Sequence, residues 1–139
     1  MQPTAIILPV AVQAALTLAV LIAMGPARAR SMREDHLSLD DRDVRLGLNH
    51  WSDQALKTAN NYKNQFEMPV LFYAVAAFAM LAGAVDVGMV TIAWIFVLSR
   101  IVHAAIHIGP NIVMLRGISF AVGVFALATM WIRLVLHIL

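Results

Sequence analysis

The chain has 139 residues, of which 61% are hydrophobic and only 13% are charged, and its net charge is +2. Soluble domains average about 25% charged residues, so the composition excludes a small water-soluble domain and predicts a membrane protein. The chain contains no cysteine. Protein disulfides, thiolate nucleophiles and cysteine metal ligands are therefore excluded.

Four apolar runs are long enough to cross the ~30 Å hydrocarbon core as helices. They predict an all-α membrane protein, a bundle of four transmembrane helices forming a single domain over residues 1–139. We expect spans at about 5–24, 66–85, 87–108 and 117–138, and a charged connector at about 25–60. The first run is interpreted as a true span, not a signal peptide, because no basic segment precedes it and three more spans follow.

Residues that break or cap helices predict where each helix ends. Gly25–Pro26 is expected to end the first helix. Ser52–Asp53 is expected to cap the second, which then runs for about 33 residues with a kink at Pro69. Gly109–Pro110 is expected to end the third helix, and the fourth is expected to begin near Arg116–Gly117.

Lysine and arginine indicate the orientation of the chain in the membrane. They concentrate in the connector between the first two spans, the turn near Asp86 has none, and Arg116 lies between the last two spans. The positive-inside rule then places both basic connections in the cytoplasm and both termini on the other side. Acidic residues nearly balance the basic ones in the connector, which argues against a polybasic lipid-binding or nucleic-acid patch.

Ionisable side chains within apolar helices are the first candidates for function, because each costs roughly 2.5–3.5 kcal/mol at the centre of a membrane. Asn60, Asn64 and Glu67 are spaced i, i+4, i+7, which predicts one stripe on the second helix. Lys57 and Lys63 lie near this stripe. The stripe is expected where the helix enters the membrane.

A second polar group lies on the third helix. Arg100, His103 and His107 are spaced i, i+3, i+7 and are expected to share one face, with Arg116 one short loop beyond. If the second and third helices are antiparallel neighbours, both groups meet in the cytoplasmic half of the bundle. One interpretation is a structural network held by an ion pair between Glu67 and Arg100.

A metal site is a further alternative, with Glu67, His103 and His107 as its ligands. Arg100 on the same helix face would repel a cation, and the HxxxH pair lacks the glutamate of the zincin motif. We therefore expect no metal.

Several short motifs occur together in a recognisable order. Asn64-x-x-Glu67, closely followed by Pro69, is the first. Arg100-x-x-His103-x-x-x-His107 is the second, and Arg116 follows it nine residues later. The chain resembles the MAPEG family, the membrane-associated proteins of eicosanoid and glutathione metabolism. It looks like a bacterial-type member, nearest in pattern to the prostaglandin E synthase and microsomal glutathione transferase branch.

This resemblance implies a homotrimer of four-helix protomers in a bacterial inner membrane. It implies glutathione bound at the cytoplasmic side between neighbouring subunits, and lipophilic substrates that react with its thiol in transferase or peroxidase chemistry. Arg116 would be the catalytic residue that stabilises the thiolate, since a nearby guanidinium favours the anion. By position, the glutathione-binding candidates are Asn60, Lys57, Lys63, Asn64, Glu67, Arg100, His103 and His107.

Two positions depart from the family pattern. Asn60 stands where the resemblance expects an arginine that grips glutathione carboxylates, and Lys57 or Lys63 would have to substitute for it. His107 stands where a tyrosine is expected. The alternative function is therefore a non-catalytic membrane scaffold or lipid-binding homotrimer that has lost glutathione chemistry.

Overall fold

A computed structural model of the chain describes residues 2–38, 40–47 and 50–139, and within them it contains helices and no strand. Four helical stretches are long and apolar enough to cross a membrane, so the prediction of an all-α, four-span protein is confirmed. The helices are η1 (Pro3–Ile6), α1 (Ile7–Glu34), α2 (Arg42–Leu46), α3 (Asp53–Asn64), α4 (Met68–Leu81), α5 (Val87–Ile108) and α6 (Val113–Ile138). The predicted connector includes residues 39, 48 and 49, which lie outside the described ranges.

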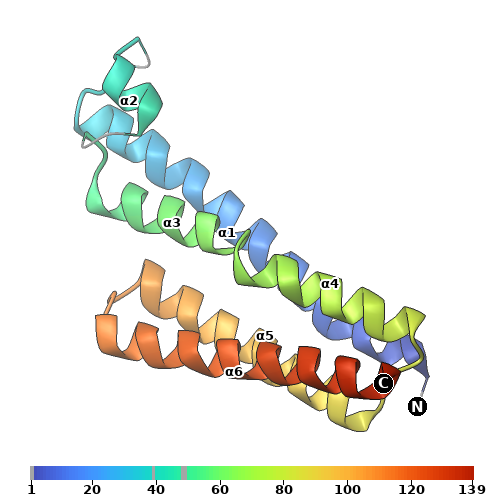
Figure 1. Ribbon diagram of the computed structural model, residues 1–139. Coiled ribbons are helices and arrows are strands. Elements are labelled where there is room, and N and C mark those ends of the chain that lie inside the picture. The colour runs from blue at the N-terminus through green and yellow to red at the C-terminus, as the bar shows by residue number, and fades with distance from the viewer. Residues whose placement is uncertain (1, 39, 48–49) are drawn as a thin grey trace.

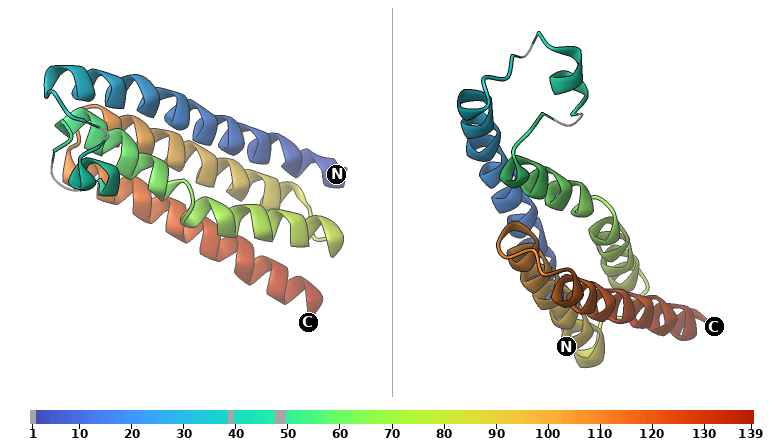
Figure 2. Two further views of the ribbon diagram at one scale, coloured as in Figure 1. Left: turned by 90° about the horizontal axis from the view of Figure 1, so that it is seen from above. Right: turned by 90° about the vertical axis from the view of Figure 1, so that its left-hand side faces the viewer.

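The long helices run up and down in one bundle. Helix α1 lies beside α3, and α5 lies beside α6, with further contacts between α1 and α5, α3 and α5, and α4 and α6 (Figure 1). Both termini lie at one end of the bundle, together with the turn that joins α4 to α5 (Figure 2). The opposite end, here called the connector end, carries α2 and the short loop between α5 and α6.

Aromatic and small side chains build the packed core. Phe72 on α4 stacks on Phe96 of α5 with ring centroids 4.5 Å apart, and both rings are fully buried. Gly123 on α6 lies so close to α5 that a Cβ there would meet Ser99 Oγ at 2.8 Å. Small residues at such a contact let membrane helices approach closely.

The outer surface of the bundle is apolar. Leu81, Phe125 and Leu136 are 83%, 74% and 68% exposed. In the most apolar window of each span, only 22–44% of residues are buried inside the protein. Such a surface is incompatible with water and fits a lipid environment, where apolar side chains face hydrocarbon at no cost.

The first helix continues past the predicted stop. Gly25–Pro26 does not end α1, which runs on to Glu34. Pro26 removes one hydrogen bond, but beyond it α1 packs along α3. The buried hydroxyl of Ser31 accepts from the backbone N–H of Ser52 at 2.8 Å and donates to Asp35 Oδ2 at 2.7 Å. These tertiary contacts outweigh the helix-breaking effect of Pro26, and α1 continues.

The second span breaks where a continuous helix with a kink is predicted. Helix α3 begins at the predicted cap, where Ser52 Oγ accepts from the backbone N–H of Ala55 at 3.4 Å, and it ends at Asn64. The chain resumes as α4 at Met68, with Pro69 in its first turn. In a continuous helix Pro69 would leave the carbonyl of residue 65 without its N–H donor, and its ring would clash with that carbonyl. A full interruption is therefore the outcome.

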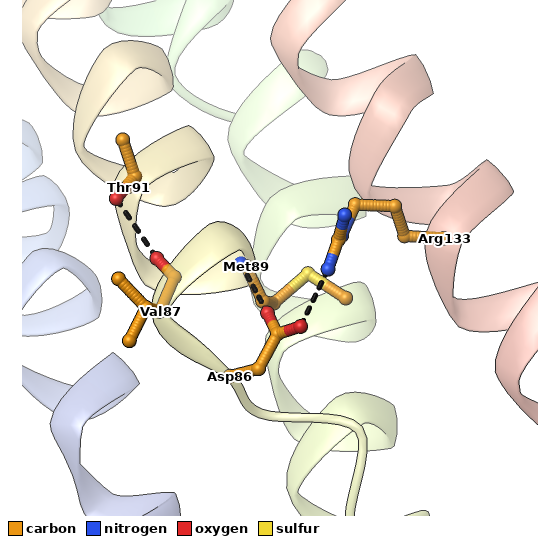
Figure 3. Close-up of polar contacts among 5 residues, drawn as sticks. All are labelled: Asp86, Val87, Met89, Thr91 and Arg133. Atoms are coloured by element: carbon orange, nitrogen blue, oxygen red, sulfur yellow. Dashed lines mark hydrogen bonds and ion pairs between the residues drawn. The ribbon is translucent and has the colours of Figure 1, made fainter. Parts of the chain in front are cut away.

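The third span begins with a capped turn at the terminal end of the bundle. Asp86 Oδ1 accepts from the backbone N–H of Met89 at 2.7 Å, and its Oδ2 accepts from Arg133 Nη2 of α6 at 2.6 Å (Figure 3). The bond from Met89 is the main reason that the pKa of Asp86 lies below its usual value, and the charge of Arg133 adds to it. Asp86 thereby ties the start of α5 to the end of α6.

The loop between the third and fourth spans is shorter than expected. Helix α5 ends at Ile108, directly before Gly109–Pro110 as predicted. Helix α6 begins at Val113, before the predicted start near Arg116, because the carbonyl of Ile112 already accepts from the backbone N–H of Arg116 at 3.0 Å. Arg116 therefore lies within the first turns of α6.

Candidate functional site

The polar side chains of α5 face the interior of the bundle. Arg100, His103 and His107 lie on one buried face, as their spacing predicts, and are 1%, 3% and 6% exposed. The two imidazole rings meet edge to face with centroids 5.7 Å apart. This face lies in the half of α5 nearest the connector end.

Arg100 is a buried cation with incomplete hydrogen bonding. Its Nη2 donates to the carbonyl oxygen of Asn64 at 3.5 Å, and its guanidinium lies 5.7 Å from the centre of the Phe120 ring. Its Nε and Nη1 have no partner among the described residues. Buried N–H groups without a partner are costly, so this site favours an acceptor such as an anion or water.

The predicted ion pair between Glu67 and Arg100 is wrong. Within the part of the chain that the structure describes, these two residues do not form a salt bridge. Glu67 is exposed, because the chain leaves helical geometry after Asn64 and Glu67 has φ −95° and ψ −91°. The two charges therefore interact only at a distance, without a direct ion pair.

Arg116 is held by a short network at the start of α6. Its Nη1 donates to Asn111 Oδ1 at 2.7 Å, and its carbonyl oxygen accepts from Ser119 Oγ at 2.9 Å. The same carbonyl lies 3.1 Å from His103 Nδ1. Because a carbonyl only accepts, Nδ1 carries the proton. In a neutral ring Nε2 is then a bare acceptor, and it is buried without a partner among the described residues.

Sequence reasoning did not single out Asn111, although it orients Arg116. Asn111 has φ +50°, a left-handed conformation that asparagine adopts more readily than most residues. Its position directly after Gly109–Pro110 was the available signal, since asparagine is common in such turns.

The candidate residues of the second span do not all point inward. Asn60, Lys63 and Glu67 are exposed, whereas Lys57 and Asn64 are half-buried. The predicted stripe of Asn60, Asn64 and Glu67 is wrong for Glu67, because α3 ends at Asn64. Asn64 meets Arg100 through its backbone carbonyl.

Comparison with models of protein families identifies the family to which the chain belongs. The model of the MAPEG family matches residues 6–136, which is nearly the whole chain. The chain belongs to the MAPEG family. The comparisons with curated proteins and with solved structures give no match. With its four apolar helices, this MAPEG protein is an integral, multi-pass membrane protein.

This MAPEG chain also contains a buried polar chain that the sequence patterns did not indicate. Gln13 Nε2 donates to Gln65 Oε1 at 3.0 Å, Gln65 Nε2 donates to Asn61 Oδ1 at 2.9 Å, and Asn61 Nδ2 donates to the carbonyl oxygen of Ala104 at 3.1 Å. The three side chains are 0–1% exposed. These hydrogen bonds link α1, the end of α3 and α5. The signal for it was Gln13, the one amide side chain in the first apolar run.

An apolar groove runs along the outer side of α5 and α6. It has a volume of about 450 Å³, and large aliphatic side chains such as Leu98, Val102 and Ile118 line most of it. Ser99 and Ser119 complete the lining, but their hydroxyls bond backbone carbonyls, and the surface of the groove is almost entirely apolar. Ser119 donates to the carbonyl of Arg116. The groove therefore lies beside a residue that bonds the backbone of Arg116.

The alternative metal site is not assembled. Among the described residues, no group of three or more histidine, aspartate or glutamate side chains is placed to hold a metal ion. His103 and His107 lie close together, but the third expected ligand, Glu67, is exposed at the break between α3 and α4. The polar groups of this MAPEG protein instead provide cations and hydrogen-bond donors.

Proposed function

We propose that this MAPEG protein is a glutathione-dependent transferase or peroxidase in which Arg116 is the catalytic residue. The observation that carries the proposal is the positive charge at the connector end, where Arg100 is buried and Arg116 is half-buried. Arg100 and Arg116 both lie there, and within the described part of the chain neither has a carboxylate within 4.0 Å. Two cations without a carboxylate partner favour an anionic ligand.

The residues present fit glutathione, which carries two carboxylates and supplies a thiol nucleophile. Arg100 offers two buried N–H groups without a partner, and the bare Nε2 of His103 can accept a hydrogen bond. Arg116 is fixed by Asn111. Its permanently charged guanidinium favours a thiolate over a thiol, and only the thiolate is nucleophilic.

The second span contributes its candidate residues from a different side. Asn60, Lys63 and Glu67 are exposed on the outside of the protomer, where they cannot close a site around a ligand alone. The proposal therefore includes a homotrimer in which a neighbouring protomer completes the site. In that arrangement Lys63 and Lys57 would stand in for the arginine that Asn60 replaces.

The co-substrate in this proposal is lipophilic and enters from the bilayer. The apolar groove along α5 and α6 offers about 450 Å³ beside Ser119, whose hydroxyl bonds the Arg116 carbonyl. An apolar molecule dissolved in lipid reaches this groove laterally, without crossing water. By the distribution of lysine and arginine, the connector end faces the cytoplasm of a bacterial inner membrane.

Glutathione binding to the detergent-purified protein, measured by calorimetry, tests the proposal. Arg116→Ala is expected to weaken binding and to abolish conjugation of a model electrophile. Arg42→Gln, which removes a charge from exposed α2, is the matched control and should change neither. Unfolding curves establish that both variants are folded. Conjugation that is unchanged in Arg116→Ala would refute the role of Arg116.

A second variant tests how Arg116 is held. Asn111→Gly keeps a backbone that tolerates φ +50° but removes the 2.7 Å bond to Arg116. We expect turnover to fall while thermal stability changes little. Absence of glutathione binding by the unmodified protein up to millimolar concentration would overturn the proposal and favour the non-catalytic scaffold or lipid-binding homotrimer.

A further inference from the structure

A cavity of about 550 Å³ lies at the connector end, between the last turns of α1, helix α2 and helix α3. Three cationic side chains line it, and each comes from a different helix: Arg28 from α1, Arg45 from α2 and Lys63 from α3. We call this cavity the basic pocket. The apolar run of α1 ends at Met24, so Arg28 lies about one helical turn beyond it, at the level of a membrane surface.

The charges around the basic pocket are segregated. Among the residues that the structure describes, no acidic residue lines it, and none of its three cations takes part in a salt bridge. Two carboxylates of the connector contact other residues: Glu34 pairs with Arg30 at 3.9 Å, and Asp43 lies 3.7 Å from His50. The balanced composition of the connector therefore hides a local excess of positive charge that only the fold reveals.

Part of the wall of the basic pocket is apolar. Met32, Val44 and Trp51 contribute to it. The indole Nε1 of Trp51 donates to the carbonyl oxygen of Val44 at 3.3 Å, and the guanidinium of Arg28 lies 5.3 Å from the centre of the Trp51 ring. Tryptophan is enriched at the membrane–water interface. A cationic rim above an apolar wall matches a molecule with an anionic head and an apolar body.

We propose that the basic pocket binds the headgroup of an anionic phospholipid. The phosphate lies against Arg28, Arg45 and Lys63, since guanidinium groups bind phosphate oxygens in pairs and lysine adds a point charge. The glycerol and the first carbons of the acyl chains lie over Trp51. This site is separate from the proposed thiol site at Arg116, although Asn60 and Lys63, which both line the pocket, are candidates for both.

Native mass spectrometry of the full chain in detergent, titrated with phosphatidylglycerol or phosphatidylcholine of equal acyl length, tests the proposal. The unmodified protein should bind phosphatidylglycerol more tightly. The double variant Arg28→Gln/Arg45→Gln should weaken that binding by roughly 10- to 30-fold, as expected for two basic residues near an anionic lipid. The double variant Arg30→Gln/Arg42→Gln removes the same charge from the same two helices outside the pocket, and it should bind like the unmodified protein.

The possible results separate the sources of the effect. Equal losses in both double variants, or equal binding of the two lipids, would overturn the proposal. Displacement of the lipid by millimolar inorganic phosphate would show a free-phosphate site and would also overturn it, as would displacement by glutathione. Arg45→Gln, at an exposed position on α2, supplies the same comparison if the first double variant does not fold. The readout needs no glutathione turnover, so the lipid proposal and the catalytic proposal fail independently.

Discussion

The buried polar chain predicts a strong effect of one uncharged residue. Gln65 makes two side-chain hydrogen bonds, accepting from Gln13 at 3.0 Å and donating to Asn61 at 2.9 Å. Gln65→Met keeps the length of the side chain but removes both bonds. It leaves the amide N–H of Gln13 and the amide oxygen of Asn61 buried without partners.

The size of the effect follows from these two losses. Hydrogen bonds between membrane helices are worth about 0.6 kcal/mol on average, whereas leaving a buried polar group unsatisfied in a protein core costs about 1–3 kcal/mol. All three side chains are 0–1% exposed, so water cannot repair the defect. We expect Gln65→Met to lower the free energy of unfolding by about 1–3 kcal/mol.

Reversible unfolding in mixed micelles, followed by circular dichroism, measures this change. Asn60→Leu is the matched control, because Asn60 is an exposed amide on α3, the helix that ends directly before Gln65, and it should stay within about 0.5 kcal/mol of the unmodified protein. Adding Gln13→Met to Gln65→Met should recover part of the loss, since it removes one of the unsatisfied groups. Equal effects of Gln65→Met and Asn60→Leu would refute the inward orientation of Gln65.

Two further predictions concern the ends and the middle of the α5–α6 pair. The bond from the backbone N–H of Met89 lowers the pKa of Asp86 in the folded protein. The charged form of Asp86 therefore stabilises the fold when the pH is above 3.8, the pKa of the unfolded state. This stabilisation is lost as the pH falls through the lower pKa of the folded state. Asp86→Asn should therefore lower the free energy of unfolding by less than about 1 kcal/mol at pH 7, and the difference should vanish on titration to acid; a constant difference would contradict it. Gly123→Ala should cost about 1–3 kcal/mol through the 2.8 Å approach to Ser99 Oγ, whereas Gly117→Ala, which meets nothing within 4 Å on the same helix, should be neutral or stabilising in the same unfolding assay.

The four spans could be predicted because the length of an apolar run depends only on the thickness of the membrane. The ends of the helices were harder, because local breakers compete with tertiary contacts. At Pro26 the packing of α1 on α3 prevails and the helix continues. At Pro69 the breaker prevails and the second span is interrupted. Sequence alone does not contain the contacts that decide between these outcomes.

The inward face of α3 shows a second limit of sequence patterns. On α5, apolar neighbours leave only one face on which Arg100, His103 and His107 can gather, so their spacing was sufficient. The end of α3 is polar on every side, and successive residues differ by about 100° in direction. The i, i+4, i+7 spacing selected Asn60, whereas the buried amide is its neighbour Asn61.

The break in the second span connects the stability of the bundle with its candidate site. Because α3 ends at Asn64, the carbonyl of that residue is free to meet Arg100 at 3.5 Å. At the start of the break, Gln65 anchors the chain to α1 and, through Asn61, to the carbonyl of Ala104 on α5. Loss of Gln65 should therefore disturb Arg100 without touching Arg116. Gln65→Met is expected to weaken glutathione binding while leaving Arg116 able to support turnover at saturating glutathione, whereas Arg116→Ala removes turnover at any concentration.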